Sequence, residues 1–263
     1  MRQRAIDQGL RLNEFGLIPE ALAGELKGME AAVHSLEASC EADIYAHLGL
    51  AYVPPELRED TGEVAAALGN DLPALLEPSM IRGSLHNHTN LSDGEASLEV
   101  MADAAHRMGW SWLGLADHSP TLVIANGASA DDLLAQGATV RAANAEWAEQ
   151  GKDFRLFHGV ESDVLEGGKL DHPDEVLNEL DYVVASVHAL GRWRGRDEQT
   201  NTEELLQAID HPATTVLGHP TGRILQGRDG YEVDLMAVLD HMAEHNAEGR
   251  LKAMEPVSYT HLT

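Results

Sequence analysis

The sequence predicts an α/β protein built on a parallel sheet or barrel, on the strength of two observations. From Ile81 onward, short β-like runs alternate with amphipathic helical stretches, which is the pattern of successive β-α-β units. Five of the six expected strands are also followed within a residue or two by a histidine or a glutamate. Because the carboxyl ends of parallel strands meet on one face, we expect these side chains to converge on one pocket.

Composition limits both the size of the fold and its function. A chain of 263 residues can form one α/β barrel, alone or with a smaller attached domain. The net charge of −26, from 18 Lys and Arg against 44 Asp and Glu, excludes a broad basic surface for nucleic acid. Cys40 is the single cysteine, which excludes a disulfide framework and a thiolate zinc site. A single cysteine also fits a reducing cytoplasm. No run approaches the ~18 apolar residues of a membrane span, so we expect a soluble protein without membrane contact.

The part of the chain before Ile81 follows a different pattern. Residues 2–50 are expected to form helices with an interruption, one of them starting at 18–20 and another running through 24–50 on a stripe of apolar residues. Residues 52–57 contain Pro54 and Pro55, so this segment is expected to be an extended linker. A short helix is expected over 62–76.

The strands and helices of the alternating part follow from its periodicity. The expected strands are residues 81–86, 112–116, 154–160, 182–187, 214–218 and 251–254. The expected helices are residues 97–108, 130–150, 173–180, 202–209 and 233–245.

The candidate metal ligands are the histidines and carboxylates at these strand ends. Two of them, His86 and His88, would lie on the same side of an extended backbone and chelate one ion. A third ligand, Asp93, lies where the chain turns, and the two oxygens of Glu161 could bridge two cations. The full set is His86, His88, Asp93, His118, Glu161, His188 and His219. Imidazoles with carboxylates and no cysteine suit Zn, Mn or Fe better than Mg.

Other polar residues near this set have more than one interpretation. Arg223 follows His219 closely, and it would be either a phosphate clamp or a surface arginine. Asp117 would either orient His118 or cap the turn that follows. His158, three residues before Glu161, is expected on the opposite face of its strand. Structural roles are expected for His158 and for the other histidines outside the set, which are His34, His47, His106, His172, His211, His241, His245 and His261.

The motifs around these residues resemble the PHP (polymerase and histidinol phosphatase) family. They are residues 85–89, 92–94, 116–119, 159–161, 186–188 and 218–223. The resemblance implies a distorted (β/α)7 barrel with two to three divalent metal ions, Mn or Zn with Fe as an alternative. It implies that His86, His88 and Glu161 hold one ion. Glu161, His188 and His219 would hold a second, and Asp93 with His118 a third.

Residues 4–17 and 42–59 are similar to the thumb of bacterial family X DNA polymerases, in which a PHP domain follows directly. The resemblance therefore implies a small helical or mixed thumb remnant over 1–60, a linker over 61–80 and a phosphoesterase domain over 81–255.

Two departures from the family pattern lead to further expectations. The polymerase palm would precede Met1, so we expect no DNA polymerisation by a chain that is truncated at both ends. The family ends on an Asp-x-His ligand pair in its last strand, and nothing after Glu255 matches it. Residues 256–263 are expected to be a foreign tail, and His261 is no credible replacement. The barrel would be incomplete at its C-terminus, with two of the three metal positions each short of a ligand.

The function implied by the resemblance is that of a 3′–5′ exonuclease acting on DNA 3′ ends in DNA repair, with related trimming of abasic or 3′-phosphate ends. Metal ions would lower the pKa of a water molecule, and the hydroxide would attack phosphorus without a side-chain nucleophile. One alternative is a small-molecule phosphatase of the histidinol-phosphate type. Another is an inactive fragment that binds metal or DNA weakly, and metal analysis would distinguish these.

Overall fold

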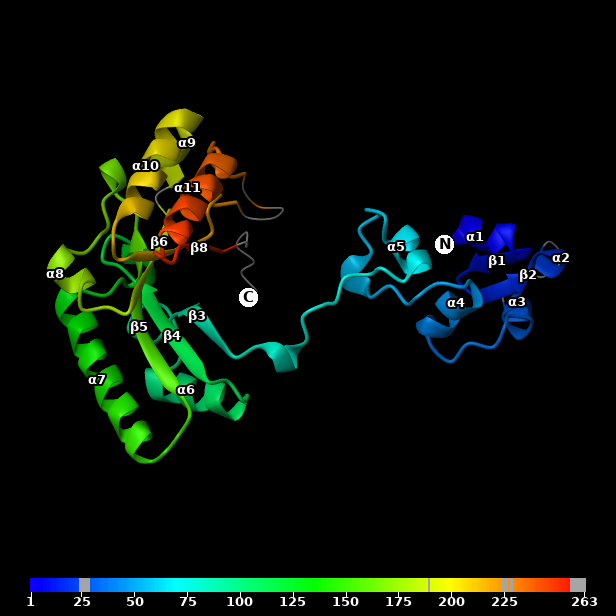
Figure 1. Cartoon of the computed structure of the whole chain (residues 1–263), viewed down its shortest axis with the longest axis horizontal. Helices are drawn as coiled ribbons and strands as arrows, with labels where there is room; N and C mark the ends of the chain where they lie inside the picture. The colour runs from blue at the N-terminus through cyan, green and yellow to red at the C-terminus, as the bar shows by residue number, and fades with distance from the viewer. Residues whose placement is uncertain (24–28, 189, 224–226, 228, 256–263) are drawn as a thin grey trace. The chain divides into compact units, whose positions relative to one another are not determined.

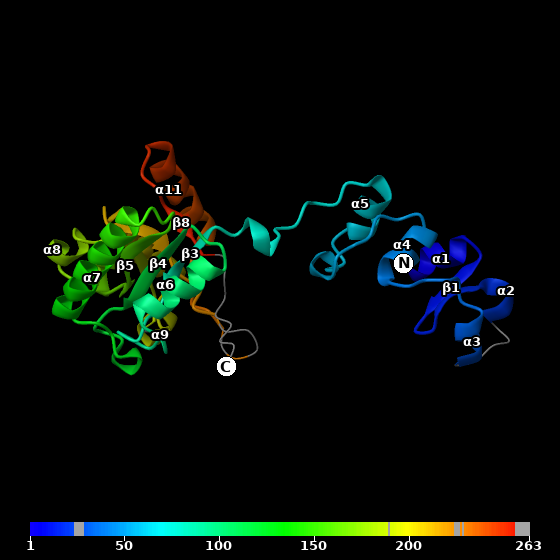
Figure 2. The same cartoon turned by 90° about the horizontal axis from the view of Figure 1, so that it is seen from below.

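The computed structural model describes residues 1–23, 29–188, 190–223, 227 and 229–255 of the chain. The chain divides into two compact units between Glu77 and Pro78. The elements of each unit can be followed in Figures 1 and 2.

The first unit is a small mixed α/β structure. Its elements are α1 (Arg2–Asp7), β1 (Leu10–Asn13), β2 (Gly16–Pro19), α2 (Glu20–Ala23), α3 (Met29–Val33), α4 (Glu41–His47), the 3-10 turn η1 (Pro55–Leu57) and α5 (Glu63–Gly69). The expectation of helices alone was wrong here, because β1 and β2 pair as an antiparallel hairpin. The backbone N–H of Phe15 donates to Asn13 Oδ1 at 2.9 Å, and Gly16 has φ 126°. A turn with a left-handed glycine favours the hairpin over a continuous helix.

The expected helix over 24–50 was also wrong. Residues 34–40 are not helical, and the backbone N–H of Leu36 donates to Leu17 O in β2 at 2.8 Å. The segment therefore packs on the hairpin, and residues 24–28 lie outside the described part. The expected helix over 62–76 is shorter than predicted because Asn70 adopts a left-handed φ of 56° after Gly69.

The second unit is a curled parallel sheet of six strands in the described residues, in the order β3-β4-β5-β6-β7-β8. The strands are β3 (Gly83–Asn87), β4 (Trp112–His118), β5 (Arg155–Asp163), β6 (Tyr182–Ser186), β7 (Thr214–Leu217) and β8 (Ala253–Met254). Each adjacent pair is parallel. The predicted parallel α/β fold is therefore confirmed, with every predicted strand near its expected place.

Helices connect these strands. They are α6 (Leu98–Arg107), α7 (Ala130–Glu149), α8 (Asp174–Leu177), α9 (Leu190–Arg194), α10 (Glu198–Asp210) and α11 (Leu235–Ala247). Short 3-10 turns are η2 (Pro78–Met80), η3 (Val123–Ala125) and η4 (Glu166–Gly168). The predicted helices are found, α8 being shorter than expected, whereas α9 was not predicted. Helix α6 packs on β4, α7 on β5, and α10 on both β7 and α11.

The two faces of the sheet have different surroundings. On β6, Val183 and Ala185 belong to the core beneath the helices, whereas Val184 packs with Ala116 and Val216 on the other face. Strand alternation places the side chain of Glu161 on that second face, next to Val184 in the register of β5 and β6. Glu161 thus lies near the carboxyl end of β5, on the face of the sheet opposite the helix-covered core.

Candidate metal centre

The centre of the site is the carboxylate of Glu161, near the end of β5 and 1% exposed. In the sheet register, Glu161 stands directly beside His118 of β4. Five imidazoles surround its two oxygens. The contacts to Oε1 are His219 Nε2 at 2.8 Å, His86 Nε2 at 3.1 Å and His188 Nε2 at 3.2 Å, and those to Oε2 are His118 Nδ1 at 2.8 Å and His88 Nε2 at 3.6 Å. The structure therefore brings all five candidate histidines onto one glutamate.

Further carboxylates contact the other ring nitrogens of these histidines. Asp93 lies 3.4 Å from His88 Nδ1 and 3.5 Å from His118 Nε2. Three ligand groups have donor atoms within 4.8 Å of one another, namely His86 with His88 and Glu161, His88 with Asp93 and His118, and His118 with Glu161 and His188. All seven candidate ligands thus belong to one cluster.

The donor atoms of this cluster fit a metal better than they fit one another. His118 Nδ1 and His188 Nε2 approach Glu161 closely, yet neither contact has the alignment of a hydrogen bond. Within the described part of the chain, these two nitrogens and Glu161 Oε2 are buried without a hydrogen bond. Such atoms are costly unless they coordinate a cation. Imidazole nitrogens converging on a carboxylate are the donor set expected for Zn or Mn.

The electrostatics of the cluster favour a charged Glu161. Burial alone would raise the pKa of Glu161, but contacts with His118, His188, His219 and His86 outweigh it and hold the pKa well below its ordinary value. Burial lowers the pKa of His88, which favours the neutral imidazole that a metal requires.

Two of the candidate ligand histidines have a backbone conformation that an L-residue rarely adopts. His86 has φ 64° and His219 has φ 24°. The expectation of an extended backbone at His86 was therefore wrong, and the pairing of β3 with β4 shifts register between Ser84 and Asn87. Left-handed backbone costs a non-glycine residue about 1–3 kcal/mol, and such strain concentrates at functional sites.

The contacts of Asp117 match neither of its two interpretations, which were orienting His118 and capping the turn that follows. Its buried carboxylate accepts from the Thr89 N–H at 2.8 Å, from Ser92 Oγ at 2.7 Å and from Gln136 Nε2 at 2.7 Å. Asp117 therefore holds the loop that leads to Asp93.

The remaining sequence candidates are Arg223 and His158. Arg223 is exposed, and its backbone N–H donates to Thr221 Oγ1 at 3.3 Å, so the phosphate clamp stays a prediction. His158 packs on the opposite face, where a Cβ on Gly137 of α7 would come within 2.7 Å of its ring. Burial lowers the pKa of His158 to about 4, so it is a neutral core histidine, as expected.

Sequence reasoning missed two carboxylates at the site. Asp163 Oδ1 lies 3.1 Å from His188 Nδ1, and Glu255 Oε1 lies 2.6 Å from His86 Nδ1. Both histidines direct their other nitrogen, Nε2, at Glu161. Asp163 was open to detection because it lies two residues after Glu161 on the same strand. Glu255 directly follows β8, where the same strand-end criterion applies.

A buried glutamate surrounded by histidines at the strand ends of a parallel α/β sheet defines a metal-dependent phosphoesterase class of site. The family comparisons agree, because the PHP domain model matches residues 84–254 and the DNA polymerase beta thumb model matches residues 1–59. The chain belongs to the PHP domain family.

Individual relatives extend this result. The chain is 35% identical over 253 residues to DNA polymerase/3′-5′ exonuclease PolX of Bacillus subtilis, covering 96% of this chain and 41% of that protein. It is 37% identical over 95 residues to Probable phosphatase CA_C0509 of Clostridium acetobutylicum, covering 36% of each. The chain thus spans about two fifths of the PolX relative. Among the described helices, none has the length and apolar character to cross a membrane.

Proposed function

We propose that this chain hydrolyses phosphodiester bonds at the 3′ ends of DNA, as a 3′–5′ exonuclease acting in repair, with related processing of damaged 3′ ends. The observation that carries the proposal is the ring of five histidines around the buried carboxylate of Glu161. The thumb match over residues 1–59 supports DNA as the substrate, since thumbs belong to DNA polymerases.

In this proposal, His86, His88, Asp93, His118, Glu161, His188 and His219 hold two or three divalent ions, Mn or Zn. Bound ions would supply Lewis-acid activation of water and neutralise phosphoryl charge. The chain's own contribution is positioning, because Glu161 fixes five imidazoles while Asp163 and Glu255 orient two of them from behind.

We place residues 1–60 as the thumb-type part, 61–80 as the connection and 81–255 as the catalytic part, in a cytoplasmic protein. With a net charge of −26, contact with DNA would be local, at the metal centre and the thumb-type part. Arg223 would add one contact to a phosphate beside His219.

The test uses the whole purified chain, manganese and a primer labelled at its 5′ end. We expect stepwise shortening from the 3′ end that requires the metal, and a loss of at least about 100-fold in His188→Gln, because ligand removal disturbs the metal centre. The matched control is His106→Gln, an exposed histidine on α6 outside the ring. Absence of shortening by the wild-type chain, or an equal rate in His188→Gln, would reject the proposal.

A second candidate is hydrolysis of a small phosphate monoester, which the match to Probable phosphatase CA_C0509 favours. The same preparation would be tested on histidinol phosphate in parallel with the primer. Release of phosphate without shortening of DNA would favour this candidate over the exonuclease.

A further inference from the structure

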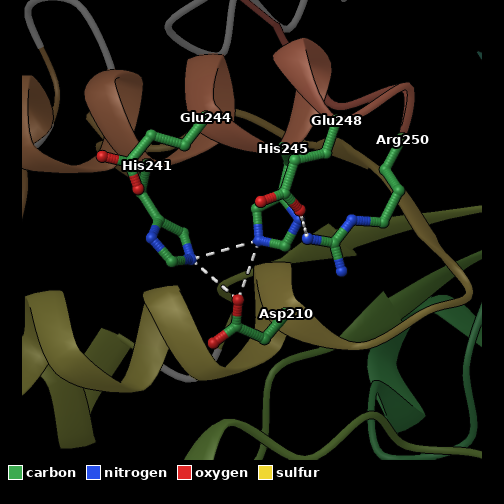
Figure 3. Close-up of a pocket in the computed structure, with 6 residues that line it drawn as sticks. All are labelled: Asp210, His241, Glu244, His245, Glu248 and Arg250. Carbon is green, nitrogen blue, oxygen red and sulfur yellow. Dashed lines mark hydrogen bonds and ion pairs between the residues drawn. The ribbon is translucent and has the colours of Figure 1, made fainter.

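A second histidine cluster lies outside the barrel centre, between α10 and α11. Asp210 is the last residue of α10, and His241 and His245 are four residues apart on α11 (Figure 3). Asp210 Oδ1 lies 2.8 Å from His241 Nε2 and 2.8 Å from His245 Nε2, and the two nitrogens are 3.3 Å apart. Three donor atoms from two facing helices thus converge.

The spacing of the nitrogens suits a tetrahedral ion. Zinc binds imidazole nitrogen at ~2.0–2.1 Å, and at the tetrahedral angle two such nitrogens are ~3.3–3.4 Å apart. The two imidazoles already have this separation. The carboxylate is closer to each nitrogen than a shared ion allows and would withdraw by ~0.5 Å to reach tetrahedral geometry. Its side chain is 54% exposed, so it has room to do so.

The surroundings of the cluster favour a cation. An open hollow of about 300 Å³ lies beside it, lined by Asp210, Glu244 and Glu248 together with the two histidines and Arg250. Arg250 pairs with Glu248, so among the residues that line the hollow Asp210 and Glu244 provide negative charge that this arginine does not offset. One ligand, His245, is buried with a side chain 7% exposed, whereas His241 is 27% exposed. The cluster is therefore fixed on one side and open to solvent on the other.

We propose that Asp210, His241 and His245 form a separate zinc-type site that cross-links α10 to α11, with water as the fourth ligand. Two imidazoles and one carboxylate are a donor set that binds Zn²⁺ well. The ion would join the helix that packs on β7 to the helix that precedes β8. Its role is structural, and it is independent of hydrolysis at Glu161.

The chain offers a matched control. His211 Nε2 lies 3.4 Å from Asp174 Oδ1, which is a histidine–aspartate pair without a second imidazole. If His241 only formed an ion pair, as His211 does, His241→Gln and His211→Gln would bind the same number of zinc ions per chain. If the cross-linking site exists, His241→Gln binds one zinc ion fewer than His211→Gln.

The experiment titrates the whole chain with Zn²⁺ and counts bound ions by equilibrium dialysis and elemental analysis. We expect His241→Gln and Asp210→Asn each to bind one zinc fewer per chain than wild type, and His211→Gln to bind the wild-type number. Equal zinc content in all four proteins would overturn the proposal.

Thermal unfolding supplies a second measurement, which needs no activity. Zinc is expected to raise the Tm of wild type and His211→Gln more than that of His241→Gln, because an ion bound only by the folded state stabilises it. The substituted side chain is partly exposed, so the variant is expected to fold. An equal zinc-induced shift in His241→Gln and wild type would overturn the cross-link.

Discussion

The two histidine clusters differ in what fixes their ligands. Around Glu161 the candidate ligands come mostly from strand ends, and the shared carboxylate is 1% exposed. Between α10 and α11 the ligands come from helix surfaces, and the shared carboxylate of Asp210 is 54% exposed. Both clusters place imidazoles within hydrogen-bond distance of one carboxylate oxygen, so distance alone does not separate them.

The clusters differ in the burial of their donor atoms and in the additional carboxylates that contact their histidines. At the barrel centre, buried donor atoms are left without hydrogen bonds in the described residues, and Asp163 and Glu255 hold histidines from behind. At the helix pair, Asp210 satisfies both Nε2 atoms. The donor atoms around Glu161 are therefore already arranged for metal binding, whereas the proposed site at Asp210 requires a small movement of one exposed side chain.

The largest expected effect comes from removing the shared carboxylate of the barrel. Glu161→Gln should lower manganese-dependent hydrolysis by at least about 100-fold, because the negative charge that contacts all five imidazoles is lost. Zinc at the helix pair should remain at one ion per chain, as measured by elemental analysis. Loss of zinc from both clusters would contradict their independence, and Asp210→Asn is the control that should spare hydrolysis.

The next effect concerns the support behind His188. Asp163→Asn should weaken manganese affinity by about 10- to 100-fold, because carboxylates that orient ligand histidines contribute on this scale. The measurement is the manganese concentration that gives half-maximal rate. A purely structural role of Asp163 would lower the rate at saturating manganese without raising this concentration. Asp174→Asn, which removes the partner of His211, serves as control and should leave this concentration unchanged.

The sequence predicts which side chains meet around Glu161, because the candidate metal ligands follow a simple positional rule. A strand is short and its end is marked, so His118, Glu161, His188 and His219 follow from strand positions. The β1–β2 hairpin was not predicted. Each of its strands has four residues, which is too few for the alternation of apolar and polar side chains to be distinguished from a helical pattern.

The site residues that were not predicted depend on tertiary packing. Glu255 contacts His86 across 169 residues, and such a pair depends on how the sheet curls. His241 and His245 show the four-residue spacing of one helix face, but the sequence does not tell that Asp210 of α10 lies opposite. Tertiary packing decides which helix supplies the third donor.

A smaller effect is expected from removing the charge of Glu204. Glu204 of α10 accepts from Arg192 and Arg196, both at 2.6 Å. Although burial opposes ionisation, these contacts lower the pKa of Glu204 to about 2. Because the folded pKa is depressed, the stabilisation is present above the unfolded value of about 4.3 and is lost as pH falls toward 2.

We therefore expect Glu204→Gln to lower the free energy of unfolding by about 1–2 kcal/mol near neutral pH. The difference from wild type should narrow between pH 5 and pH 3, measured by urea unfolding. A difference that is constant across this range would show that ionisation of Glu204 is not its source. The exposed Glu203→Gln on the same helix is the control.

The smallest expected effect compares the arginines beside the two clusters. Arg223 follows His219 of the barrel centre, whereas Arg250 lines the hollow at the helix pair and is paired with Glu248. Arg223→Gln should raise the KM for a DNA primer about twofold to fivefold with kcat little changed, since an exposed ion pair contributes about 0.2–1 kcal/mol. Arg250→Gln should leave both constants unchanged, because its guanidinium lies at the other cluster. An equal KM for Arg223→Gln and wild type would remove Arg223 from the site, and a matching rise in Arg250→Gln would mean that general surface charge, and not position beside His219, sets the affinity.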